Sequence, residues 1–239
     1  MIYWRLLRLS LRYSVLHYVR YPVEWLSNYI GGAVLLIGVL LGGEAAFHYA
    51  VAEKAGALLF SFVTITALQA PLKFLEGRAS EVEEVHLYPV NAAGMLVTYG
   101  MTTSLAMYFN LFLLYATLSL ILHLPPAGLA RMAYYLAPAF ISMLGLGLVL
   151  AGLQVLFKRL GALPNLLSIL LLTAAFSPAG ALSGAGRVFP VAQAFLGVQG
   201  FPVNQLSLWI EAAAYAAAGW YVFGICQRLM TRWGTSATA

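Results

Sequence analysis

The sequence contains no aspartate, a single cysteine and very few charged residues. All eight acidic residues are glutamates, and charged types make up 9% of the 239 residues. The absence of aspartate excludes aspartyl intramembrane proteases and aspartyl-phosphate pumps, whose chemistry requires that carboxylate. Cys226 has no second cysteine with which to form an intrachain disulfide or a redox pair. Because the four histidines are scattered along the chain, we predict no metal site.

Apolar residues dominate what remains. Hydrophobic types account for 62% of the chain, whereas a typical soluble domain has roughly 45–50% apolar and about 25% charged residues. A chain of this length with so little polar surface could not cover itself in water. The composition therefore predicts an integral membrane protein, and it excludes a soluble enzyme and a nucleic-acid-binding protein.

Six stretches are long and apolar enough to predict membrane-spanning helices, each of which needs about 20 residues. We therefore predict an all-α polytopic fold with a six-helix transmembrane domain over residues 23–227, preceded by an interfacial helix and followed by a cytoplasmic tail over 228–239. The six predicted spans cover residues 25–41, 56–75, 92–122, 133–157, 163–177 and 206–225.

The distribution of cations predicts the orientation of these spans. With the N-terminus in the cytoplasm, ten lysines and arginines fall in inner segments, and only Lys54, Arg131 and Arg187 fall in outer loops. Cytoplasmic loops of membrane proteins carry an excess of Lys and Arg. We therefore predict a multi-pass protein of the cell inner membrane with both termini in the cytoplasm.

Residues 1–22 predict a basic amphipathic helix on the inner surface of the membrane. Arg5, Arg8 and Arg12 recur at spacings of three and four, which gathers them on one helical face, and Pro22 ends the helix. Such a helix either anchors the chain to anionic head groups of the lipid bilayer or holds a partner protein. Both roles remain open.

The inner loop over residues 76–91 contains half of all the acidic residues. Residues 80–87 favour a short helix that Pro89 stops, and its acidic and apolar side chains are typical of a docking surface for a soluble partner. The alternative is a solvated loop. The residues assigned to this coupling surface are Glu76, Glu81, Glu83, Glu84, Val85, Leu87, Tyr88 and Pro89.

The segment over residues 183–204 is apolar but broken by prolines and glycines. It predicts two short re-entrant or interfacial helices on the outer side, because irregular backbone at membrane depth must be shielded by protein. Glu211, about one turn into the last span, is expected to pair with Arg187. The segment either caps a pathway from outside or only fills space. The predicted outer gate consists of Arg187, Pro190, Pro202 and Glu211.

The layout and two motifs resemble the membrane subunit of type-2 ABC transporters, a family of exporters. In that family the first inner loop reads like G-T-L-E, a few apolar residues, then T-P-V. Here Glu83 matches the glutamate and Pro89-Val90 the proline pair, whereas Ser80-Glu81 replace the glycine and threonine. Residues 183–204 resemble the family's outer S-G…P…N-P region through Ser183-Gly184, Pro190 and residues 201–204, with the last dipeptide altered.

The resemblance implies a dimer of permeases, formed with a second copy or a homologous chain. It also implies that loop 76–91 docks on a separate ABC ATPase, present in two copies, which binds ATP and Mg. The residues agree independently that this chain is not an ATPase, because it contains no G-x-x-x-x-G-K-[ST] phosphate loop. No cofactor is expected in this chain.

The predicted function is therefore a permease subunit of an ABC exporter that moves an amphipathic or lipid-like substrate outward. Two alternatives remain: an ion-coupled secondary transporter, for which Glu211 would be the ionisable group, and a non-transporting structural membrane subunit. The predicted spans carry aromatic side chains that suit an amphipathic substrate, namely Phe60, Phe62, Tyr99, Tyr108, Phe109 and Phe176.

Overall fold

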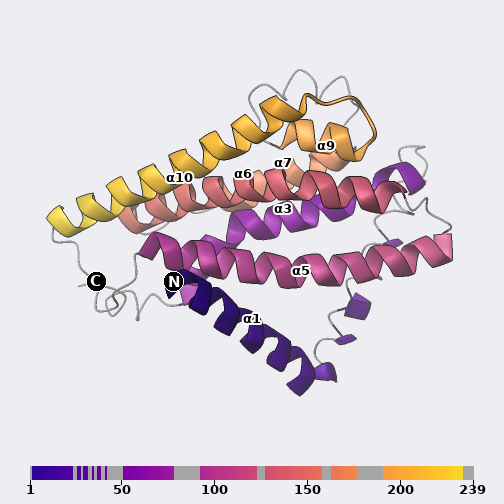
Figure 1. Ribbon diagram of the computed structural model, residues 1–239, viewed down its shortest axis with the longest axis horizontal. Coiled ribbons are helices and arrows are strands. Elements are labelled where there is room, and N and C mark those ends of the chain that lie inside the picture. Colours follow the sequence, from indigo (N-terminus) through magenta and orange to yellow (C-terminus); the bar gives the residue numbers. More distant parts are fainter. Residues whose placement is uncertain are drawn as a thin grey trace.

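The computed structural model describes residues 2–23, 26–27, 29–31, 34, 37–38, 41, 51–77, 92–122, 127–157, 163–176 and 191–233. The regular structure within these ranges is helical and includes no strand, so the predicted all-α class is confirmed for them (Figure 1). The helices are α1 (Ile2–Arg20), α3 (Val51–Gly77), α5 (Ala92–Leu122), α6 (Ala127–Phe157), α7 (Leu163–Phe176), α9 (Ala192–Val198) and α10 (Gln205–Trp233).

Four of the described helices are long and apolar enough to cross a membrane, which gives the chain the character of a multi-pass membrane protein. The apolar spans are Ala57–Leu75, Ala93–Ile121, Ala130–Phe157 and Gln205–Leu229. They correspond to the second, third, fourth and last of the six predicted spans. Of the 17 residues of the predicted first span, nine are described, and all nine are helical. The predicted fifth span corresponds to α7, whose 14 residues are about 21 Å long and shorter than the hydrocarbon core.

Two helices extend beyond their predicted spans. α6 begins at Ala127 instead of residue 133, and α10 continues to Trp233, into residues that the prediction assigned to the cytoplasmic tail. The hydropathy of the chain falls at these positions, but the ladder of backbone hydrogen bonds continues into the polar flanks. The start of α6 and the end of α10 therefore extend beyond the apolar stretch of each helix.

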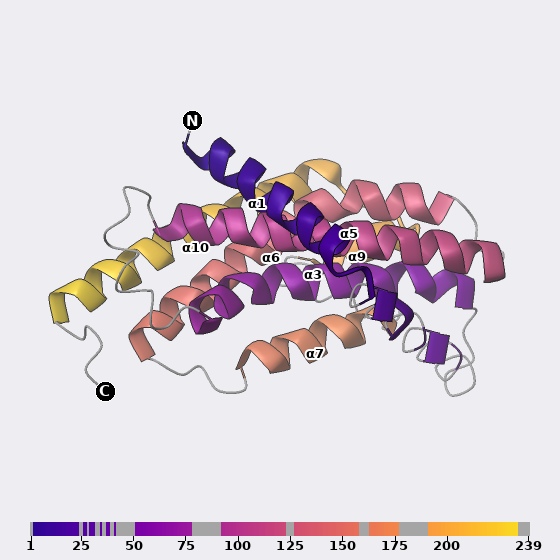
Figure 2. The ribbon, with the colours of Figure 1, turned by 90° about the horizontal axis from the view of Figure 1, so that it is seen from below.

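α3 lies at the centre of the bundle and contacts α5, α6, α7 and α9. α6 packs between α3 and α10, and α1 crosses α5 obliquely on the opposite side of the bundle from α10 (Figure 2). The middle of α3 is buried: Phe60, Leu68 and Ala67 have no exposed surface. Two buried polar side chains of α3 are satisfied within the helix, because Ser61 and Thr64 donate hydrogen bonds to backbone carbonyls of the preceding turn.

α6 and α10 approach each other so closely that only glycine fits at their contact. A Cβ at Gly145 would strike the carbonyl oxygen of Tyr215, and a Cβ at Gly219 would strike the carbonyl oxygen of Gly145. In lipid, where the hydrophobic effect does not drive helices together, small residues allow the backbone approach that gives dispersion contacts. This pair of glycines therefore determines where α10 docks.

Candidate functional site

The helix directions place α9 at one end of the bundle and, at the other end, the helix ends that flank the predicted coupling surface (Figure 1). α3 ends and α5 begins at the end where α10 also ends, so the chain between them, which contains the predicted coupling surface, starts and finishes there. α9 and the beginning of α10 lie at the other end, where the predicted outer gate belongs. The end of α3 and the turn between α9 and α10 thus lie at opposite ends of the bundle.

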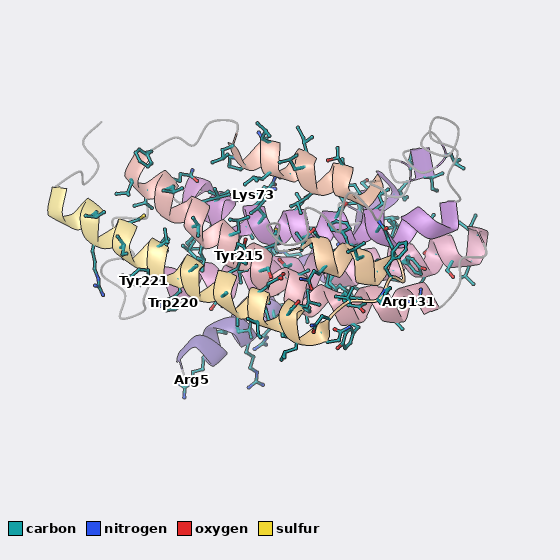
Figure 3. All side chains as sticks on the ribbon, turned by 90° about the horizontal axis from the view of Figure 1, so that it is seen from above. Arg5, Lys73, Arg131, Tyr215, Trp220 and Tyr221 are labelled. Atoms are coloured by element: carbon teal, nitrogen blue, oxygen red, sulfur yellow. The ribbon has the colours of Figure 1, made fainter. Side chains whose placement is uncertain are left out.

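Described cations also separate along the bundle. Figure 3 shows Arg5 and Lys73 toward the end where α3 finishes and Arg131 at the end where α9 lies. Arg228 lies near the end of α10, which finishes on the same side as α3. The assignment of these two ends to the inner and outer faces of a membrane stays a prediction.

Most of the predicted coupling surface lies outside the described residues. Glu76 belongs to the last turn of α3, and the rest of that surface, from Glu81 to Pro89, falls in the undescribed range 78–91. The coupling surface therefore stays a prediction. The structure describes only the two helix ends that flank it.

The predicted interface helix is helical over Ile2–Arg20. Its three arginines, Arg5, Arg8 and Arg12, are exposed, whereas Leu7 and Leu11 are partly buried. Leu7 and Leu11 line a cavity beside α5, but the apolar Leu9 and Leu16 are exposed like the arginines, so the amphipathic interface helix stays a prediction. The position of α1 relative to a membrane stays a prediction.

Within the predicted outer gate the structure describes Pro202 and Glu211, while Arg187 and Pro190 lie outside the described residues. Pro202 is exposed in the turn between α9 and α10. Glu211 receives a hydrogen bond from Gln193, whose Nε2 lies 2.6 Å from Glu211 Oε1. The partner that the structure shows for Glu211 is thus an amide of α9, which the sequence analysis did not consider.

A polar cluster forms around this contact, where α9 and α10 meet α6. The Ser207 hydroxyl donates to Gln193 Oε1 at 2.9 Å, so Gln193 links both neighbours on α10. On the other side of the turn, Gln205 Nε2 donates to the Tyr135 hydroxyl of α6 at 3.0 Å. We call Gln193, Gln199, Gln205, Ser207 and Glu211 the outer polar cluster.

The outer polar cluster contains buried polar atoms with no hydrogen-bond partner among the described residues. They are Glu211 Oε2, Gln199 Nε2 and Gln205 Oε1. A buried polar atom without a partner costs about 1–3 kcal/mol, and more when the group is charged. Three such atoms, in the turn after α9 and in the first two turns of α10, are typical of a place that meets water, an ion or another chain.

The turn that carries this cluster is held tightly against α6. Gly200 has a φ of +93°, which glycine adopts without steric cost, and the Arg131 guanidinium lies beside it, 2.7 Å from where a Cβ would be. Gly197 faces the Tyr135 ring with no room for a side chain. Phe195 of α9 packs edge-on against Phe60 of α3, with ring centroids 4.9 Å apart. The end of the bundle is therefore closed by well-packed aromatic side chains.

Several of these residues were missed by the sequence analysis. Gln193 is a polar residue inside an apolar stretch, V-A-Q-A-F-L, and a buried amide in such a stretch needs a partner. The sequence could therefore have predicted that Gln193 needs a hydrogen-bond partner. The identity of its partner depends on the packing of α9 against α10, which the spacing of residues does not specify.

The predicted aromatic residues are divided between core and surface. Phe60 is buried in the core, Tyr99 and Phe109 are exposed on α5, and Tyr108 lines the cavity beside α1. The described residues contain no group of three or more His, Cys, Asp or Glu side chains that could hold a metal ion. No family model, curated protein or solved structure matches this chain.

Proposed function

We propose that this chain is the permease subunit of a type-2 ABC exporter, which moves an amphipathic or lipid-like substrate outward with ATP hydrolysed by a separate ATPase. The observation that carries the proposal is the separation of the two functional ends. The helix ends that flank the acidic loop lie at one end of the bundle, and the outer polar cluster lies at the other.

In this proposal the chain crosses the cell inner membrane six times, with residues 25–41 and 163–177 as the two remaining spans. Both termini lie in the cytoplasm, residues 183–204 re-enter from outside, and α1 starts at the inner end and packs obliquely along α5. The location of Arg5 and Lys73 at the end opposite Arg131 supports this orientation.

Topology can be tested by cysteine accessibility after Cys226→Ala, since Cys226 is the single native cysteine. We expect cysteines placed at Lys54, Pro126 and Arg187 to react with a membrane-impermeant maleimide from outside intact cells. A cysteine at Arg159 should react only after the cells are opened. Reaction at Arg159 from outside would contradict the six-span arrangement.

Coupling can be tested with the double variant Glu83→Lys, Glu84→Lys. Rim charges steer and align a partner, and like charges facing each other across the interface oppose docking. Because truncated apolar anchors at an interface cost about 2 kcal/mol or more, Leu87→Ala should weaken assembly further than either single Glu→Gln change. We expect the double variant to uncouple ATP hydrolysis from transport.

The measurement is co-purification with the co-expressed ATPase, followed by substrate-stimulated hydrolysis in vesicles. Glu53→Lys is the matched control, because Glu53 lies in the first turn of α3, at the opposite end of that helix. Assembly and coupling equal to wild type in the double variant would contradict the proposal. The isolated chain should show no ATPase activity.

One observation favours a second candidate, an ion-coupled secondary transporter. Glu211 lies within the apolar span of α10, and its Oε2 is buried without a partner among the described residues. An ionisable group inside a membrane protein is often part of a proton or ion pathway. Transport by vesicles that contain a proton gradient and no ATP, lost in Glu211→Gln, would favour this candidate over the ABC permease.

A further inference from the structure

One face of α1 is exposed over most of the length of the helix. Six exposed side chains lie on this face within an arc of about 100°, since successive residues of a helix turn by about 100°. We call them the open face of α1: Arg5, Arg8, Arg12, Val15, Leu16 and Val19. Leu7 and Leu11, which line the cavity beside α5, lie about 110° from its centre. The open face is therefore the side of α1 that the described part of the bundle leaves uncovered.

The open face is basic in its first half and apolar in its second half. Its three arginines lie within residues 5–12, and its aliphatic side chains lie within residues 15–19, where Val19 is 73% exposed. Leu9, which is also exposed, lies at the edge of the basic half. α1 contains no acidic residue, so the positive charge is not neutralised within the helix.

The direction of α1 places the two halves at different positions along the bundle. α1 begins at the end where α3 finishes and α5 starts (Figure 1), and it runs obliquely along α5 from there (Figure 2). Figure 3 shows Arg5 pointing away from the bundle. From Arg5 to Val19 the helix rises about 21 Å, which does not exceed one leaflet with its head groups, about 20–22 Å. The arginines therefore lie at the end of the bundle and the aliphatic side chains toward its middle.

We propose that the open face of α1 binds an anionic phospholipid, whose phosphate is held by Arg5, Arg8 and Arg12 and whose acyl chain lies along Val15 and Val19. Guanidinium groups donate paired hydrogen bonds to phosphate oxygens, and side chains three and four residues apart on a helix are neighbours. The proposal requires a membrane protein and does not rest on the proposed transport function. In the orientation proposed above, this lipid belongs to the inner leaflet.

A phospholipid fits both halves of the open face, whereas an acidic soluble protein fits one. Clusters of cationic side chains at a membrane surface attract anionic lipids. A soluble partner could meet the arginines at the end of the bundle, but the aliphatic side chains would then need a second apolar contact nearer its middle. In a bilayer, the acyl chain that follows the phosphate supplies this contact.

Arg20 provides a matched control on the same helix. It is exposed, but it lies about 90° from the centre of the open face. Its guanidinium carbon lies 5.9 Å from the centroid of the Tyr21 ring, a distance at which a cation is attracted to the ring. Arg20→Gln removes one positive charge, as does Arg8→Gln. Comparison of the two variants therefore separates the position of a charge from the total charge of α1.

The experiment is native mass spectrometry of the full chain, purified in detergent and titrated with phosphatidylglycerol or with phosphatidylcholine of the same acyl chains. We expect phosphatidylglycerol to bind more tightly at the first site. Arg8→Gln should weaken its binding about fivefold, and the triple change Arg5→Gln, Arg8→Gln, Arg12→Gln about 100-fold if the contributions add. Arg20→Gln should change binding less than about twofold. Lysine at the same three positions keeps the charge and should retain most of the affinity.

The apolar half is tested with the acyl chain. Phosphatidylglycerol that carries a photoreactive diazirine at the end of an acyl chain should label the tryptic peptide over residues 13–20. The double change Val15→Ser, Val19→Ser should weaken binding, whereas Leu120→Ser, Ile121→Ser should not, because these two side chains are equally exposed but lie at the far end of α5. If the triple glutamine variant fails to fold, the lysine variant and the labelled peptide still decide the question.

Four results would overturn the proposal. The first is equal affinity for phosphatidylglycerol and phosphatidylcholine. The second is an equal loss of binding in Arg8→Gln and Arg20→Gln, which would indicate attraction to the total charge without a site. The third is competition by glycerophosphoglycerol, which lacks acyl chains, as strong as that by the intact lipid, since this would indicate a site for free anions. The fourth is unchanged lipid binding in the triple glutamine variant together with lost co-purification of the ATPase, which would indicate that α1 holds a partner protein.

Discussion

α3 and α10 are both apolar helices long enough to cross a membrane, yet they have opposite surroundings. In the most apolar stretch of α3, 67% of residues are buried inside the bundle, against 22% in that of α10. α3 is surrounded by four helices, whereas α10 packs mainly on α6. Figure 3 shows Trp220 and Tyr221 on α10, and these side chains are 45% and 70% exposed.

The comparison shows that hydropathy alone does not determine which apolar helix becomes the centre. In α3, large side chains such as Phe60 and Leu68 are fully buried, and its hydroxyls are satisfied by its own backbone. α10 instead carries many alanines and meets α6 through backbone contact at Gly219. Buried large side chains hold α3 in place. α10 is held instead by close backbone contact with α6, which is possible because Gly145 and Gly219 have no side chains.

The largest loss of stability is expected from Phe60→Ala, which removes a buried side chain from α3 at the centre of the bundle. Phe60 is fully buried and packs edge-on against Phe195, and removing a buried Phe costs about 3–5 kcal/mol through lost contact and the cavity left behind. Tyr221→Ala on α10 should change stability by less than about 0.5 kcal/mol. The measurement is the free energy of unfolding in mixed micelles. Equal losses in both variants would show that α3 is not the core.

A smaller effect is expected from Gly219→Leu, which separates α10 from α6. The new side chain would meet the backbone of Gly145, which cannot move aside as a side chain would, and overpacking costs about 1–3 kcal/mol. Gly224→Leu is the matched control on the same helix, because no described atom lies within 4 Å of a Cβ there. Thermal unfolding followed by size-exclusion chromatography should distinguish the two. A normal melting temperature for Gly219→Leu would argue against the glycine contact.

The smallest of the three effects is expected from Gln193→Leu, which weakens the link between α9 and α10. Loss of the hydrogen bonds to Glu211 and Ser207 should lower stability by about 1–2 kcal/mol. In a Glu211→Leu background the same change should cost less, because the bond to the carboxylate is already absent. Strictly additive losses in this double-mutant cycle would show that the two side chains do not interact.

Part of this architecture was predictable from the sequence. The predicted bounds of α5 are confirmed at Ala92 and Leu122, because the apolar run is continuous between Pro89 and Pro125 and proline stops helices. The contact of Gly145 with Gly219 was not predictable, since the chain contains 22 glycines and their spacing does not say which helices are neighbours. The same reason applies to the bond between Gln193 and Glu211. The glycine contact and the hydrogen bond both depend on which helices become neighbours in the fold, and the sequence pattern does not specify this.

The lengths of α5 and α6 have a consequence for the membrane around them. Each has 31 residues and is therefore about 46 Å long, while the hydrocarbon core is about 30 Å thick. A helix of that length would need a tilt of about 50° to fit inside, which exceeds the observed range of about 0–40°. At a tilt of about 40° roughly five residues of each helix lie among the head groups or beyond them, and at smaller tilts more do. A thicker bilayer would draw those turns in and reduce the mismatch.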